Sequence, residues 1–184
     1  MNFLEEIKLY EPQNEQEQKD KFVMMQYIVM FYDKIAYRSN MLFHMTASAI
    51  VCNENKDKVL MIYHKIYQSW SWLGGHADGE YDLQKTAIKE VQEETGISEL
   101  KAMKNGIVSL DILTVEGHYK NEEYVCPHIH LNVTYCFIAS EKSKLTLNEI
   151  ETEGVKWIPI SEITQYCTEA KMLPIYQKII QRIK

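Results

Sequence analysis

The feature that most constrains the fold is the glycine pair Gly74-Gly75, which separates a short apolar segment from an amphipathic helix. Residues Trp70 to Leu73 predict an extended piece that runs into the glycines, and a polar loop follows them. A helix is predicted from about Asp82 to Thr95, because Asp82 is a suitable N-cap and Gly96 suits the left-handed C-terminal position. The sequence therefore predicts a strand, a glycine turn and a helix in direct succession.

Three glutamates, Glu90, Glu93 and Glu94, stand at positions i, i+3 and i+4 of this helix, so their carboxylates are expected on one face. Such like-charge pairs repel by about 0.2–0.5 kcal/mol each on an isolated helix. A solvated acidic face is the ordinary explanation of this pattern. A hard dication is the alternative, because Mg²⁺ and Mn²⁺ prefer oxygen ligands and the glycine pair brings bare backbone near the same helix.

The first 40 residues predict helix, with Asn14 as a cap and Glu15 and Glu17 in the first turn. Apolar residues recur at helical spacing on what is expected to be one buried face. These residues are Phe22, Met25, Val29, Tyr32 and Ala36. We interpret residues 1–41 as an N-terminal helical extension and residues 42–184 as the main domain.

From Leu42 the hydrophobic period changes to that of strands. Strands are expected near residues 42–51, 59–64, 106–115, 128–139 and 155–160, with a turn at 53–57, a polar loop at 116–127 and an acidic turn at 148–153. A short helix is expected to open at Ser161 and a terminal one to cover residues 174–184. Helices interspersed among strands predict an α/β layered body with a mixed sheet.

Composition excludes some classes of protein. Twenty Lys and Arg against 26 Asp and Glu give a net charge of −6, which argues against nucleic-acid or membrane-surface binding through bulk positive charge. The four cysteines form no C-x-x-C pair and the N-terminus is acidic, so reduced thiols and a cytoplasmic location are expected. The apolar run from Phe22 to Tyr32 is too short to cross a bilayer.

The glycine turn and the acidic helix resemble the Nudix box, G-x5-E-x7-R-E-U-x-E-E-x-G-U with U apolar, of the Nudix hydrolase superfamily. The matching residues are Gly75, Glu90, Val91, Glu93, Glu94, Gly96 and Ile97. The resemblance implies an α/β/α sandwich, and the N-terminal helical extension is similar to that of a bacterial subgroup of the superfamily.

Two positions depart from the box. The first glutamate of the motif falls on Tyr81, with Glu80 one residue earlier, and Lys89 stands where the family usually has arginine. In the family these two side chains brace the loop against the helix. Lysine lacks the planar fork of arginine, so we expect Glu80, Asp78 or Asp82 to meet Lys89 instead.

The resemblance implies a metal-dependent hydrolase that cleaves a diphosphate linkage, in a nucleoside diphosphate linked to another moiety or in a related organic diphosphate. Mg²⁺ or Mn²⁺ would be held by Glu93, Glu94 and the carbonyl of Gly75. Glu90 is expected to be a further ligand or the base that orients water, and Lys89 an electrostatic support. Candidates for a base outside the box are Glu122, Glu123, Glu149, Glu151 and Glu153.

Substrate contacts are expected from Lys65 and His76 near the loop, and from His128 and His130 on the polar face of the strand 128–139. The alternative is that this face only forms hydrogen bonds beneath a loop. A zinc site on Cys126-x-His128-x-His130 is disfavoured, because no second ligand pair with structural zinc spacing accompanies it.

Two other functions remain open to the sequence. A non-catalytic, nucleotide-binding Nudix regulatory domain is one. An allylic diphosphate isomerase is the other, and its chemistry would need a protonating cysteine such as Cys126 or Cys136. The expected partner is a small-molecule diphosphate, with no nucleic acid and no membrane, and the apolar segment 22–32 makes a homodimer possible.

Overall fold

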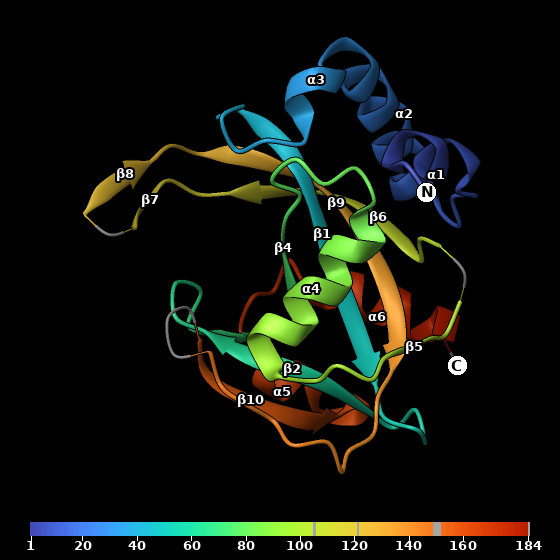
Figure 1. Ribbon diagram of the computed structural model, residues 1–184, viewed down its shortest axis with the longest axis vertical. Helices are drawn as coiled ribbons and strands as arrows, with labels where there is room; N and C mark the ends of the chain where they lie inside the picture. Colours follow the sequence, from blue (N-terminus) through green and yellow to red (C-terminus); the bar gives the residue numbers. More distant parts are fainter. Residues whose placement is uncertain (105, 121, 149–151, 184) are drawn as a thin grey trace.

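One mixed sheet with helices on both faces organises the protein (Figure 1). The computed structural model describes residues 1–104, 106–120, 122–148 and 152–183. Within these ranges the central strands follow the order β10-β2-β1-β9-β5, while β3 pairs with β2, β4 with β1 and β6 with β9. The bounds are β1 Phe43–Cys52, β2 Lys58–His64, β3 Ser69–Ser71, β4 Leu73–His76, β5 Lys101–Ala102, β6 Ser109–Val115, β9 His128–Ile138 and β10 Thr152–Pro159.

The helices divide the apolar core into two layers. They are α1 Phe3–Leu9, α2 Glu15–Met30, α3 Tyr32–Ile35, α4 Leu83–Thr95, α5 Ile163–Tyr166 and α6 Leu173–Ile183, with a 3₁₀ turn at Ile160–Glu162. One core cluster joins α4 and the N-terminal helices to the sheet, and the second joins α5 and α6 to the opposite face. This arrangement confirms the predicted α/β/α sandwich with an N-terminal helical extension.

The predicted buried face of the N-terminal helix is wrong at two of its five residues, since Ala36 is buried and Met25 and Tyr32 pack on the core. Phe22 and Val29 are 63% and 67% exposed, whereas Met24 and Ile28 are fully buried. The helix α2 ends at Met30, so spacing counted across residues 22–36 joins two helices that do not share one face. The predicted cap is confirmed, because the Asn14 side chain accepts a hydrogen bond from the Glu17 backbone N–H.

Two further differences concern strands. The predicted loop 116–127 contains a hairpin of β7 (His118–Lys120) and β8 (Glu123–Val125), which extends away from the body (Figure 1). The predicted hairpin of β1 and β2 exists, but only the end of β1, at Val51 and Cys52, pairs with β2 in the described structure. The rest of β1 pairs with β4 instead, which carries the glycine pair into the centre of the sheet. In the predicted acidic turn, residues 149–151 lie outside the described ranges.

A buried ionic network fastens the N-terminal helices to the C-terminal one. Glu17 of α2 accepts hydrogen bonds from both terminal nitrogens of Arg182, at 2.5 and 2.9 Å. Lys178 of α6 lies 3.1 Å from Glu17 and 2.7 Å from Asp111 of β6. The four side chains are at most 13% exposed, so these elements pack as one body. In the described part of the chain, no helix is long and apolar enough to cross a membrane.

Candidate functional site

The glycine pair on β4 lies directly against the side chains of α4. A Cβ built on Gly75 would meet the Glu90 carboxylate at 2.4 Å, and one on Gly74 would meet the Ala47 carbonyl oxygen of β1 at 2.5 Å. The Gly74 backbone N–H donates to Glu94 Oε2 at 3.1 Å. Only glycine permits this approach of strand and helix, and it places backbone and carboxylate oxygens side by side.

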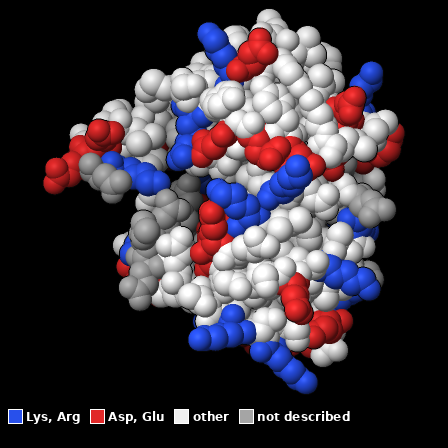
Figure 2. All heavy atoms as spheres, in the orientation of Figure 1, with Lys and Arg blue, Asp and Glu red and all other residues white. Residues whose placement is uncertain are grey.

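Glu93 lies apart from the other two glutamates of the predicted site, Glu90 and Glu94. Glu94 is 5% exposed, whereas the side chain of Glu93 is 52% exposed and forms an ion pair with Lys89 at 3.3 Å. The structure therefore brings Glu90 and Glu94 against the glycine pair and leaves Glu93 beside Lys89 on the surface of α4. Figure 2 shows the two signs of charge intermixed over the face that α4 presents.

The loop between β4 and α4 is fastened to the N-terminal extension. Asp78, at a positive φ of 45°, forms a two-pronged ion pair with Arg38 at 2.6 and 2.8 Å. Glu80 accepts from the backbone N–H of Asp82 at 2.8 Å. Among the described contacts, Lys89 pairs with Glu93 and with none of the three acids expected to meet it.

A cavity of about 330 Å³ opens between this loop and the first turns of α4. It is lined by His76, Ala77, Asp78, Glu80, Lys85, Thr86 and Lys89. Two lysines and one histidine border the cavity and favour an anionic group there. Asp78 and Glu80 also border it and oppose such a group. The cavity shares Lys89 and His76 with the predicted site.

The donor set at the glycine pair fits a hard divalent ion. Glu90 and Glu94 supply carboxylate oxygens, and the Gly75 carbonyl belongs to the residue that the Glu90 carboxylate touches. Oxygen donors of this kind suit Mg²⁺ and Mn²⁺. A metal of the type expected from the sequence is therefore compatible with the residues present.

A buried polar stripe crosses β1 and β9 beside this site. The two strands are parallel, with Thr46 opposite Asn132 and Ser48 opposite Thr134. Thr46 Oγ1 and Ser48 Oγ both donate to Asn132 Oδ1 at 2.9 Å, and Asn132 Nδ2 donates to Thr134 at 3.2 Å. Asn132 and Thr134 therefore follow the alternative given above, in which the polar face of the strand 128–139 forms hydrogen bonds.

The other half of the stripe is a cluster of four histidines, His44, His76, His128 and His130, which we call the histidine cluster. One ligand atom from each lies within 4.8 Å of the others. Burial lowers the pKa of His44, and with the neighbouring positive charges it lowers the pKa of His76 to about 3 and that of His130 to about 2. The imidazoles of His76 and His130 are therefore neutral near pH 7.

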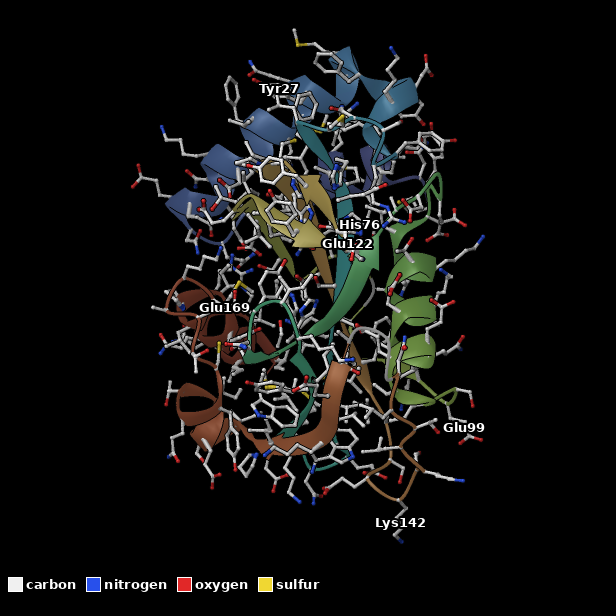
Figure 3. All side chains as sticks on the ribbon, turned by 90° about the vertical axis from the view of Figure 1, so that its left-hand side faces the viewer. Tyr27, His76, Glu99, Glu122, Lys142 and Glu169 are labelled. Carbon is white, nitrogen blue, oxygen red and sulfur yellow. The ribbon has the colours of Figure 1, made fainter. Side chains whose placement is uncertain are left out.

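Three of the four histidines, His76, His128 and His130, are predicted substrate residues. The remaining histidine of the cluster, His44, was missed by sequence reasoning. The available signal was that His44 and His130 each occupy a polar position of an alternating strand. Figure 3 shows His76 at the end of β4 nearest the start of α4. The fourth predicted substrate residue, Lys65, is exposed in the turn between β2 and β3 and is not part of this cluster.

The candidate bases outside the box lie at the periphery. Glu122 and Glu123 are exposed in the β7–β8 hairpin, and Glu153 is exposed on β10. Glu149 and Glu151 lie outside the described residues. Among the described acids, Glu90 is therefore the candidate base that lies at the glycine pair.

Comparisons with known proteins agree with this fold. A family model described as the NUDIX domain matches residues 42–183. A search of curated proteins found no match. Three solved structures illustrate the similarity of fold.

The first is an Ap4A hydrolase from C. elegans in a binary complex, with a TM-score of 0.55, 16% identity, and coverage of 75% of this chain and 97% of that chain. The second is the dihydroneopterin triphosphate pyrophosphohydrolase of E. coli, with a TM-score of 0.56, 15% identity, and coverage of 76% and 94%. The third is the NUDIX domain of Shewanella oneidensis NrtR with ADP ribose, with a TM-score of 0.50, 17% identity, and coverage of 86% and 97%.

Proposed function

The chain belongs to the Nudix hydrolase family, and from this premise we propose that it cleaves the P–O–P linkage of an organic diphosphate with the help of Mg²⁺ or Mn²⁺. The observation that carries the proposal is the contact of the Glu90 carboxylate with Gly75, together with the hydrogen bond from Gly74 to Glu94. These contacts support the box assignment, because they place the motif's glycine and two of its glutamates at one point.

Glu90, Glu93, Glu94 and the Gly75 carbonyl would hold the metal. When bound, a divalent ion neutralises phosphate oxygens and lowers the pKa of a ligated water. For Glu93 this role requires its side chain to leave Lys89, an exchange that costs little because an exposed pair contributes about 0–1 kcal/mol. Glu90 is the proposed base that orients the attacking water.

The remaining predicted residues are assigned by location. Lys89 borders the cavity, and we propose that it supports the developing phosphate charge. His76 borders the same cavity, so it is the predicted substrate residue with the most direct access to a bound phosphate. The contacts expected from Lys65, His128 and His130 with the leaving group stay predictions, and for the two histidines they apply to a cluster that holds no metal.

A nucleoside diphosphate linked to another moiety is the proposed substrate class. Two structures of similar fold carry names of enzymes that act on Ap4A and dihydroneopterin triphosphate, which supports this class. We further propose that residues 42–184 carry the activity, that residues 1–41 brace the loop through Arg38, and that the enzyme works in the cytoplasm, as its unpaired cysteines suggest. A homodimer stays a prediction, and light scattering, which measures the mass of the particle in solution, would test it.

The isomerase alternative loses support from the cysteines. Cys136 is 1% exposed in the core layer that faces α6, and burial raises its pKa. The sulfur of Cys126 donates to the Met41 carbonyl oxygen at 3.6 Å. The buried Cys136 is therefore not available to protonate a substrate bound at α4.

The experiment is a phosphate-release screen over nucleoside and non-nucleoside diphosphates with Mg²⁺ or Mn²⁺. We expect metal-dependent release that Glu93→Gln lowers at least 100-fold while the thermal midpoint stays unchanged. Glu99→Gln is the matched control, because Glu99 is exposed beyond the end of α4 and away from His76 (Figure 3). Nucleotide binding without turnover across the panel would favour the regulatory alternative instead.

A further inference from the structure

Three adjacent strands bring the histidine cluster together. Across the parallel pair of β1 and β9, His44 lies opposite His130, and across the antiparallel pair of β1 and β4, His76 lies opposite Thr46. Ring centroids of His44 lie 5.0 Å from His76 and 5.1 Å from both His128 and His130. Four imidazoles therefore meet where β1, β4 and β9 pair, and none of the α4 glutamates belongs to this group.

Two of the rings are oriented by the backbone. His44 Nδ1 lies 3.0 Å from the Asn40 carbonyl oxygen, and His128 Nδ1 lies 2.9 Å from the Cys126 carbonyl oxygen. Because a carbonyl oxygen only accepts, each Nδ1 carries the proton and each Nε2 keeps a lone pair. Carbonyl groups hold metal-ligating histidines in this way in known sites.

One of these lone pairs has no partner in the described structure. His44 is 4% exposed, and its Nε2 has no hydrogen-bond partner among the described residues. His128 Nε2 accepts a hydrogen bond from His130 Nε2 at 3.1 Å, and metal binding would replace this bond. A buried nitrogen without a partner is unfavourable, so a ligand that binds the His44 lone pair would stabilise the fold.

The separations match those around a small cation. Four nitrogens bound at about 2.0–2.1 Å to a tetrahedral zinc ion lie roughly 3.3–3.4 Å apart. The pair at 3.1 Å is already at that spacing, and the whole set within 4.8 Å needs only small ring rotations to reach it. Neutral imidazole suits zinc, cobalt and nickel rather than magnesium.

We propose that the histidine cluster binds one divalent transition-metal ion of the zinc class, at a site separate from the glutamates of the box. The bound ion ties β1, β4 and β9 together immediately after Gly75, and so it fixes the strand end from which the loop departs. The proposal goes beyond the hydrolase function and does not depend on it, because its ligands and its metal differ from those of the box.

The experiment measures metal uptake by the full-length protein after removal of metals with a chelator. Zn²⁺ is titrated, and bound zinc is counted by elemental analysis after desalting. We expect one equivalent per chain in the wild type, and a rise in the thermal midpoint of about 5–10 °C at a free concentration of 100 times Kd. His130→Asn and His76→Asn should lose the retained zinc and the thermal shift.

Matched controls separate this site from the box and from chance. His118→Ala alters a histidine of β7 outside the cluster, and Glu93→Gln alters the box, so both should retain one zinc. X-ray absorption of the zinc-loaded wild type should show about four nitrogen neighbours near 2.0 Å, a readout that needs no variant. Loss of hydrolysis in Glu93→Gln with zinc retained would leave this proposal standing.

Three results would overturn the site. They are no stoichiometric zinc, cobalt or nickel in the wild type, an oxygen-dominated absorption spectrum, or equal zinc in His130→Asn. Binding of inorganic phosphate that depends on His130, without metal uptake, would also overturn it and identify an anion site instead.

Discussion

The carboxylate of Glu90 occupies the space that a side chain on Gly75 would need, with a Cβ there 2.4 Å from Glu90 Oε1. The clash in Gly75→Ala involves the far end of a flexible side chain, so Glu90 can move aside at small cost in stability. We therefore expect hydrolysis to fall at least 100-fold, while the free energy of unfolding changes by less than about 1 kcal/mol. Enzyme assays and urea unfolding on the same preparation measure both.

Gly74→Ala is the counterpart, and we expect it to lower the stability of the fold more than Gly75→Ala does. Its Cβ would lie 2.5 Å from the Ala47 carbonyl oxygen, and its φ of 155° is one that L residues rarely adopt. Backbone cannot yield as a side chain does, so unfolding should become easier by about 1–3 kcal/mol or more. Equal stability losses in the two alanine variants would contradict the reading of Gly75 as a contact with Glu90.

Glu94→Gln separates charge from hydrogen bonding. The amide oxygen of glutamine still accepts the bond from the Gly74 N–H, so the strand and helix should stay in register. Removal of the charge takes away a proposed metal ligand, and activity should fall at least about 100-fold. Circular dichroism and a thermal midpoint within roughly 4 °C of the wild type would show that the fold is kept.

Acid should destabilise the protein through Glu17. Burial alone would raise the pKa of this carboxyl, but hydrogen bonds from Arg182 and the Gln13 N–H, and the charge of Lys178, lower it to about 2. A lowered folded-state pKa gives stability that is complete above the unfolded value near 4.3 and is lost as pH falls toward 2. The expected loss is on the order of 3 kcal/mol, seen as a falling urea midpoint.

The control for that loss is Glu17→Gln, because other groups also titrate. Burial raises the pKa of Asp111, which opposes the effect of Glu17 as pH falls, although Lys178 contacts both acids. The variant should lose about 3–5 kcal/mol at pH 7, since it leaves Arg182 and Lys178 buried without this partner. Its stability should then vary less than that of the wild type between pH 4.5 and 2, and an unchanged slope would assign the acid sensitivity elsewhere.

Asn132 should be essential to the sheet. It is 1% exposed and accepts from the hydroxyls of Thr46 and Ser48. Asn132→Ala leaves both hydroxyls without an acceptor, so we expect a loss of about 2–4 kcal/mol. Urea unfolding measures it.

Local patterns predicted the elements that carry the function. The bounds of α4 follow from spacing and from Gly96, its left-handed C-cap at φ 76°, within about 15 residues. Asp82 occupies the predicted N-cap position, but its side chain makes no capping hydrogen bond. The alternation along β9 likewise predicted its polar face. By contrast, the hairpin of β7 and β8 was missed, because its stability comes from pairing between strands that a polar segment does not reveal.

The sequence by itself determined the acidic helix and a strand before it, because each depends on neighbours a few residues away. The glycine pair, predicted as a turn, lies instead within β4 and pairs with β1, which is a tertiary contact. The tertiary structure alone decided that Glu90 and Glu94 face the glycine pair while Glu93 faces Lys89, since this depends on how α4 is rotated against β4. It also decided that His44 meets His130, 86 positions later, because the register of two parallel strands is set by packing across the whole sheet.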